Sequence, residues 1–129
     1  TASRVSVARK EESPSGRRRK VEVRLKNRST RRATFLFGSE QVLSLKDAHV
    51  NRVGEADGIR RFSVVDPAAR LEVSWAFSRP ARLWHFPLES VRGEERVYQG
   101  ICLVWLWPVT LEPGRSWAVR WELSVGEER

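Results

Sequence analysis

The stretch LEPGRSWAVRWELSV, residues 111–125, decides the fold class of this chain. It opens with a turn of the Pro-Gly kind, and from Ser116 onward polar and apolar residues alternate as far as Val125. A period of two places the apolar side chains on one side of an extended strand and the polar ones on the other. The apolar side consists of Trp117, Val119, Trp121, Leu123 and Val125. The stretch therefore predicts a half-buried β-strand.

The rest of the chain repeats this pattern in shorter pieces and shows no sustained helical period. Strands are predicted over residues 21–25, 33–37, 41–45, 60–65, 70–77 and 97–106. Gly38 is expected to break the second of these, and residues 46–58 are expected to form a long loop. Residues 97–106 are too apolar to have a wet face, which predicts a central strand. About eight short strands separated by turns indicate an all-β fold, an antiparallel two-sheet β-sandwich of jelly-roll or Greek-key type.

The length of 129 residues fits one domain, and the charge is unevenly distributed. Residues 1–32 carry twelve Lys and Arg against three Glu, or +9, and residues 33–129 carry twelve against thirteen Asp and Glu, or −1, which gives the total of +8. Residues 1–20 are predicted to be a basic linker or edge segment, with residues 9–20 an exposed loop, because Ser, Pro, Gly and charges dominate there. The sandwich is placed at residues 21–125 and a short tail at 126–129. Because the chain lacks an initiator Met, we expect it to begin inside a longer protein.

Composition excludes several classes of protein and site. No apolar run reaches the roughly 20 residues that a membrane-spanning helix needs, and the start of the chain has no apolar signal segment. Cys102 is the only cysteine and lies in an apolar run, so we expect its side chain to be buried as a small apolar residue. A single cysteine also predicts that the protein is located in the reducing cytoplasm. No phosphate-binding or nucleophile-elbow motif occurs, so we expect no catalysis, no metal and no cofactor.

Six Trp residues suggest a sugar-binding platform, but their positions favour the core for most of them. The apolar sides of alternating strands carry Trp75, Trp117 and Trp121. One face of the predicted strand that begins at Val97 carries Trp105 and Trp107. Trp84 begins a predicted loop beside His85 and Pro87, and is the best candidate for an exposed aromatic contact. A lone His such as His85 is more often structural than catalytic.

The residues LWHFPLESV (83–91), VYQG (97–100), Trp107-Pro108 and the turn at 111–117 together resemble one known domain. It is the C-terminal β-sandwich domain of family-57 glycoside hydrolases, the α-amylase and 4-α-glucanotransferase enzymes. FGSEQVLSL, residues 37–45, is similar to a further strand of that domain, so the resemblance covers about residues 20–125. Two departures stand out: residues 92–96 form a shorter loop than in the family, and Val42 replaces an Asn.

The resemblance implies a galactose-mutarotase-like sandwich that is not itself an enzyme. It implies an accessory domain that packs on the catalytic β/α barrel of the same polypeptide and contacts an α-glucan. The region from Trp84 to Tyr98 would be a loop facing the barrel or the sugar. Contacts with carbohydrate or partner are expected from Glu40, Trp84, His85, Glu89, Tyr98 and Gln99. Structural hydrogen bonds are an alternative role for Glu40 and Gln99.

Two other functions fit parts of the sequence. The strand from Val23 to Ser29 and the stretch 111–125 also resemble intracellular proteinase-inhibitor sandwiches, which would make the chain a free-standing protein-interaction module. The basic run Arg17, Arg18, Arg19 and Lys20 would suit nucleic-acid phosphates. A solvated arm is the preferred interpretation of that run, because no aromatic residue is interleaved for base stacking.

Overall fold

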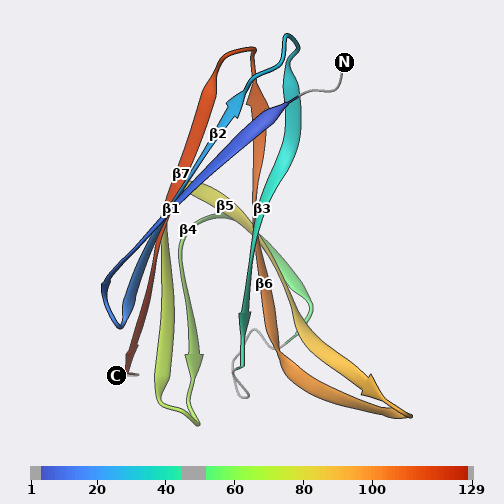
Figure 1. The fold of residues 1–129 in the computed structure, drawn as a ribbon. Helices are drawn as coiled ribbons and strands as arrows, with labels where there is room; N and C mark the ends of the chain where they lie inside the picture. Colours follow the sequence, from blue (N-terminus) through green and yellow to red (C-terminus); the bar gives the residue numbers. More distant parts are fainter. Residues whose placement is uncertain (1–3, 45–51, 128–129) are drawn as a thin grey trace.

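Seven β-strands make up the described part of the computed structural model, which covers residues 4–44 and 52–127 (Figure 1). No helix occurs among these residues, and so none that is long and apolar enough to span a membrane. The strands are β1 (Val5–Ser15), β2 (Arg18–Asn27), β3 (Ala33–Leu43), β4 (Gly54–Asp66), β5 (Leu71–Arg92), β6 (Glu95–Leu111) and β7 (Ser116–Glu127).

One long strand, β5, connects two layers of antiparallel sheet. Its first part pairs with β7 from Leu71↔Glu127 to Phe77↔Trp121, and its second part pairs with β6 from Arg82↔Leu106 onward. The first layer therefore contains β1, β2, β7 and the start of β5, and the second contains β3, β6 and the end of β5. β4 pairs with both parts of β5. The predicted all-β, antiparallel, sandwich-like class is confirmed.

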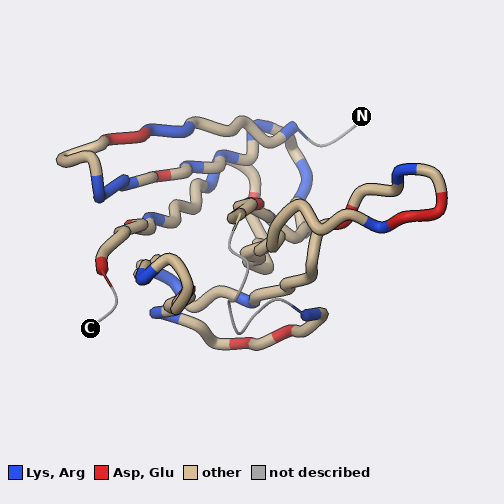
Figure 2. The backbone as a smooth tube through the Cα atoms, turned by 90° about the horizontal axis from the view of Figure 1, so that it is seen from below, with Lys and Arg blue, Asp and Glu red and all other residues tan. Residues whose placement is uncertain are grey.

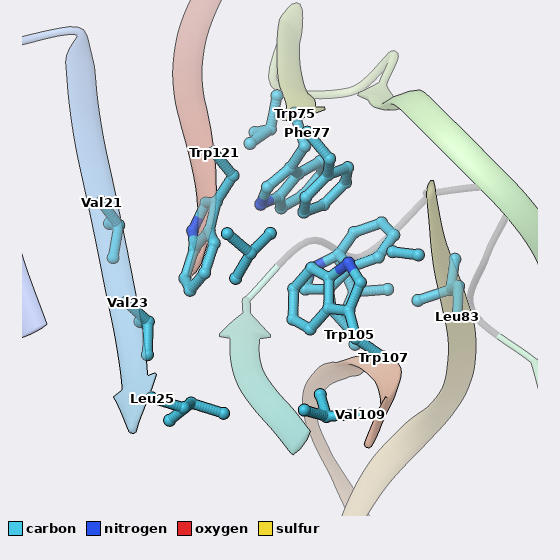
Figure 3. Close-up of a cluster of buried hydrophobic side chains, with 14 of the residues drawn as sticks. Val21, Val23, Leu25, Trp75, Phe77, Leu83, Trp105, Trp107, Val109 and Trp121 are labelled. Carbon is cyan, nitrogen blue, oxygen red and sulfur yellow. The ribbon is translucent and has the colours of Figure 1, made fainter. Parts of the chain in front are cut away.

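The hydrophobic core lies between the layers, where the alternating strands meet (Figure 3). Register places Val21 opposite Trp121 and Val23 opposite Val119, so β2 and β7 turn one apolar face toward β6. Four of the tryptophans predicted for the core are buried, and Trp117 is partly buried against it; the buried four are Trp75, Trp105, Trp107 and Trp121. Burial of a large apolar side chain contributes roughly 1.5–3 kcal/mol, so these rings supply much of the stability.

The predicted turn after β2 is organised by Asn27, whose side chain is fully buried. Its Nδ2 donates to the carbonyl oxygens of Arg31 at 2.7 Å and Leu111 at 2.9 Å. Its Oδ1 accepts from the backbone N of Ser29 at 3.0 Å and from the Ser29 hydroxyl at 2.7 Å. Because Leu111 ends β6 while Asn27 ends β2, this side chain ties the two layers together at one end of the sandwich.

The structure of the N-terminal segment differs from the one predicted from the sequence. Except for the turn at Gly16 and Arg17, residues 9–20 are strand rather than linker or loop: β1 continues to Ser15, and β2 already begins at Arg18. A polar sequence suffices because β1 is the edge strand of its layer and is held by backbone pairing with β2 rather than by a buried face. Figure 2 shows Lys and Arg spread along this hairpin.

Four further boundaries also differ. Gly38 does not break a strand, since β3 runs through it from Ala33 to Leu43. Glycine suits this position because an added Cβ would lie 3.1 Å from Leu106 Cδ2. The expected loop after Trp84 is instead a β-hairpin, in which β5 and β6 extend to a turn at Gly93, and this hairpin projects from the body (Figure 1). The expected loop at 46–58 lies partly outside the described residues, and its last five residues, from Gly54 onward, belong to strand β4 instead. Strand β7 ends at Glu127, inside the expected tail.

Candidate functional site: the outer face around Trp84

The outer face of the second layer is apolar, although it faces away from the core. Register aligns Trp84, Val104 and Glu40 in one row across β5, β6 and β3, and Phe86, Cys102 and Val42 in the next. Directly opposed residues share a face of the sheet, so these rows form one surface. We call it the outer apolar face; its exposed members are Leu36, Val42, Trp84, Phe86 and Leu88.

The corresponding face of the first layer has the opposite character. There the rows run Lys10–Glu22–Arg120 and Glu12–Lys20–Glu122 across β1, β2 and β7. Opposite charges on neighbouring strands suit contact with water. Large apolar side chains on the outer apolar face remain well exposed, with Leu36 at 52% and Trp84 at 42%. Several large apolar side chains exposed on one face of a sheet are typical of an interaction surface.

Glu40 and Cys102 lie together within this face. The Cys102 thiol donates to Glu40 Oε1 at 3.2 Å, and the Cys102 side chain is only 1% exposed. Burial, then the hydrogen bond to Glu40 and its negative charge, raise the pKa of the Cys102 thiol to about 11. A thiol with so high a pKa is a poor nucleophile at neutral pH, which agrees with the buried structural role expected for Cys102.

Trp84 separates two hollows where β5 meets the start of β4. Glu55 lies directly opposite Trp84, and Asp57 and Arg82 form an ion pair at 3.8 Å. One hollow, of about 440 Å³, is lined by Glu55, Ala56, Asp57, Arg82 and Trp84. The other, of about 420 Å³, is lined by Val53, Gly54, Glu55, Trp84, His85 and Phe86. An exposed indole flanked by carboxylates and a guanidinium combines an apolar platform with hydrogen-bonding groups that match sugar hydroxyls.

His85 holds the start of β4 in place. Its Nδ1 lies 2.7 Å from the carbonyl oxygen of Arg52, and its ring lies against Gly54, where an added Cβ would come within 2.5 Å of Nε2. Only glycine leaves room for the ring at that position. The contact supports a structural role for His85, at the wall of the second hollow.

The remaining predicted residues lie in the projecting hairpin rather than on the outer apolar face. Glu89 opposes Tyr98 next to a bulge and lies 3.8 Å from Arg96, while Gln99 Nε2 donates to the Ser90 hydroxyl at 2.9 Å. Tyr98 packs against the core, and burial, followed by the negative charge of Asp66, raises its pKa. The six predicted residues are therefore not brought together. Glu40 and Trp84 lie on the outer apolar face, whereas the side chain of His85 alternates to the other side of β5, beside the start of β4. Glu89, Tyr98 and Gln99 lie in the hairpin.

The basic run is divided by the β1–β2 hairpin. Arg17 lies in the turn, while Arg18, Arg19 and Lys20 begin β2 and alternate between its two faces. Arg18 forms an ion pair with Glu122 at 3.3 Å, and Lys20 also lies opposite Glu122. The run therefore does not present four cations on one side.

The polar groups beside Trp84 were not predicted from the sequence. Glu55 and Asp57 lie in a stretch interpreted as loop, and nothing in the order of residues indicated that β4 would lie beside Trp84. Within residues 4–44 and 52–127, no group of three or more His, Cys, Asp or Glu is placed to hold a metal ion.

The chain matches one family model and is similar to several solved structures. The family model for the C-terminal domain of alpha-amylase/4-alpha-glucanotransferase matches residues 15–121. A 4-alpha-glucanotransferase from Thermococcus litoralis has a similar structure (TM-score 0.75, 20% identity), over 93% of this chain and 18% of that one. The Slr1438 protein from Synechocystis sp. PCC 6803 is also similar (TM-score 0.62, 15% identity), over 96% of this chain and 62% of the other. The chain thus spans less than a fifth of the glucanotransferase. No curated protein sequence matches significantly.

Proposed function

Because the chain belongs to the family of C-terminal domains of alpha-amylase/4-alpha-glucanotransferase, we propose that it is a non-catalytic accessory domain of an α-glucan-active enzyme. Its covalent partner is then the catalytic domain of the same polypeptide. We further assign that parent enzyme to family 57 of the glycoside hydrolases, with a β/α barrel as the catalytic domain. The family match and the resemblance of residues 83–108 support this assignment.

The observation that carries the packing role is the outer apolar face. It contains exposed Leu36, Val42 and Phe86, whereas the outer face of the first layer carries alternating charges. Removing apolar surface from water is favourable by about 25 cal/mol per Å². A neighbouring domain therefore gains more free energy by covering the outer apolar face than by covering the charged one.

A second role, contact with the glucan, is favoured by the hollows beside Trp84. They lie where β5 adjoins β4, at the border of the outer apolar face, and one of them brings Glu55, Asp57 and Arg82 to the indole. A sugar ring stacked on Trp84 would find acceptors and donors for its hydroxyls at the same place. When the outer apolar face packs on the catalytic domain, Trp84 would lie at the edge of this interface and remain open to the substrate cleft.

The packing role is tested in the full-length enzyme with Leu36→Glu. A carboxylate in a covered apolar contact loses hydration without gaining a partner, so the domain should detach more readily. We expect limited proteolysis between the domains to become several-fold faster. Val7→Glu is the matched control, because Val7 is also an exposed apolar side chain, at 62%, but lies on edge strand β1. Equal cleavage rates for the two variants and the unmodified enzyme would count against packing through this face.

The glucan role is tested by affinity electrophoresis of the full-length enzyme in gels containing amylose or glycogen. Trp84→Ala removes the platform and should reduce the retardation of the protein band. Val53→Ala is the control, since Val53 is exposed beside the same hollow but has no aromatic face. If Trp84→Ala migrates like the unmodified enzyme, Trp84 does not contact glucan.

A further inference from the structure

A third hollow lies at the bend where β5 crosses from the first layer to the second. β4 pairs Ile59 with Ala81 and Arg61 with Ala76, so Arg60 alone faces the four residues from Phe77 to Pro80. The resulting hollow measures about 580 Å³. It is lined by Arg60, Ser78, Arg79, Pro80, Trp107, Pro108, Trp117, Ala118 and Arg120.

The apolar wall of this hollow is rigid. The rings of Trp107 and Trp117 lie 6.3 Å apart, and Trp107 is buried. The guanidinium of Arg79 lies 5.2 Å from the centroid of Trp117, and Arg79 Nε donates to the carbonyl oxygen of Ala118 at 2.7 Å. Stacking and the hydrogen bond together fix Arg79 against the indole.

The polar wall carries three guanidinium groups and no carboxylate. Arg60 makes a single long hydrogen bond of 3.5 Å to the Ser78 carbonyl oxygen. Within the described residues, the Arg120 side chain has no hydrogen bond or ion pair. Its cross-strand neighbour Glu22 lies 3.5 Å from Arg24 instead. Each guanidinium offers five N–H donors, so most of the donors in this hollow have no protein acceptor.

We propose that this hollow binds a phosphorylated monosaccharide. Guanidinium groups bind phosphate oxygens through paired, charge-assisted hydrogen bonds. The side chains of Pro80 and Pro108 supply apolar surface for the C–H face of the sugar. A neutral glucan gives the three cations no counter-charge, so the ligand differs in class from the one considered for Trp84. The inference does not rest on the proposed packing or glucan roles.

The test is isothermal titration calorimetry of the full-length enzyme at constant ionic strength, with glucose 1-phosphate, inorganic phosphate and glucose as probes. Glucose 1-phosphate should bind more tightly than inorganic phosphate, and glucose should not bind at this site. Loss of a charge-assisted hydrogen bond costs about 1.5–3 kcal/mol, so Arg60→Ala and Arg120→Ala should each weaken binding about 10- to 100-fold. The variants separate this hollow from any sugar site elsewhere in the enzyme.

Arg61→Ala is the matched control, because Arg61 follows Arg60 in β4 but lines a different hollow with Arg18 and Glu122. It removes the same charge and should leave binding unchanged. Loss of affinity in Arg61→Ala equal to that in Arg60→Ala would overturn the site, as would absence of saturable binding of either phosphate probe. Equal affinity for inorganic phosphate and glucose 1-phosphate would overturn the sugar part of the proposal. Thermal unfolding of each variant confirms that its fold is intact.

Discussion

Replacing Asn27 by Ala should destabilise the sandwich without touching either proposed ligand site. The Asn27 side chain is fully buried and makes four hydrogen bonds, two from Nδ2 to the carbonyl oxygens of Arg31 and Leu111 and two to Oδ1 from Ser29. Replacement by Ala removes these hydrogen bonds and leaves the Leu111 carbonyl oxygen buried without the donor that Asn27 supplied. The change therefore acts where β2, the following turn and the end of β6 meet.

The size of the effect follows from these contacts. A hydrogen bond contributes about 1 kcal/mol net, so four bonds set an upper figure of about 4 kcal/mol. Once Asn27 Oδ1 is removed, the single proton of the Ser29 hydroxyl is free for the Arg31 carbonyl oxygen 2.9 Å away, and the groups of Ser29 are near water, so part of the loss is recovered. We expect the free energy of unfolding to fall by about 2–3 kcal/mol. For a domain of this size, that lowers Tm by roughly 10 °C.

Urea unfolding followed by tryptophan fluorescence measures the change, because four Trp rings are buried in the core. The midpoint should fall while the slope with urea stays constant, as expected when only the stability of the native state changes. Ser29→Ala is the comparison: it keeps Asn27 and should cost about 0.5–1 kcal/mol. A loss in Asn27→Ala no larger than that in Ser29→Ala would refute the view that Asn27 ties the layers together.

Three further predictions concern the second layer. Gly100→Ala should cost about 2–4 kcal/mol in urea unfolding, because its Cβ would lie 2.5 Å from the Leu43 carbonyl oxygen; Gly126→Ala, with nothing within 4 Å, should be near neutral. Cys102 should resist alkylation in the folded protein at pH 8. Its folded pKa of about 11 exceeds its ordinary value of 9.0, so the unfolded chain loses the proton first. Stability is thus unaffected below pH 9 and falls as pH rises from 9 toward 11, by on the order of 2 kcal/mol. Cys102→Ala should lack this part of the decline, and an identical pH profile would contradict the assignment. Glu40→Gln should lower the thiol pKa, read from thiolate absorbance at 240 nm, yet leave it above 9, since burial is the larger cause.

Most strands were predictable from the sequence because their side chains alternate against a core. The stretch 116–125 and the segment from Val21 to Leu25 have this pattern, and both are strands whose buried faces meet. Strand β1 was missed because an edge strand held by backbone hydrogen bonds needs no alternating apolar face. The hairpin beyond Trp84 was missed for a related reason: it projects from the body, so neither of its faces is required to be apolar.

The candidate site was predictable only in part. The aromatic side chain of Trp84 beside a Pro-containing segment indicated exposure, and its 42% exposure agrees. Glu55 and Asp57 lie about 30 residues earlier, and only the pairing of β4 with β5 brings them to the indole. The same pairing leaves Arg60 opposite the bend of β5, which no pattern in the sequence indicates.

The class of the fold, the burial of most tryptophans and the family follow from the amino-acid order alone, because they depend on local alternation and on the order of short motifs. Which face is left apolar and exposed depends on how the strands pair in the folded molecule. The alternation of side chains along β3 and β5 is the same whether or not a neighbour later covers their outer surface. The register of the three strands is what places Glu40, Val104 and Trp84 in one row and turns that row outward. A surface composed of residues far apart in the chain arises from pairing, and pairing is a property of the folded molecule.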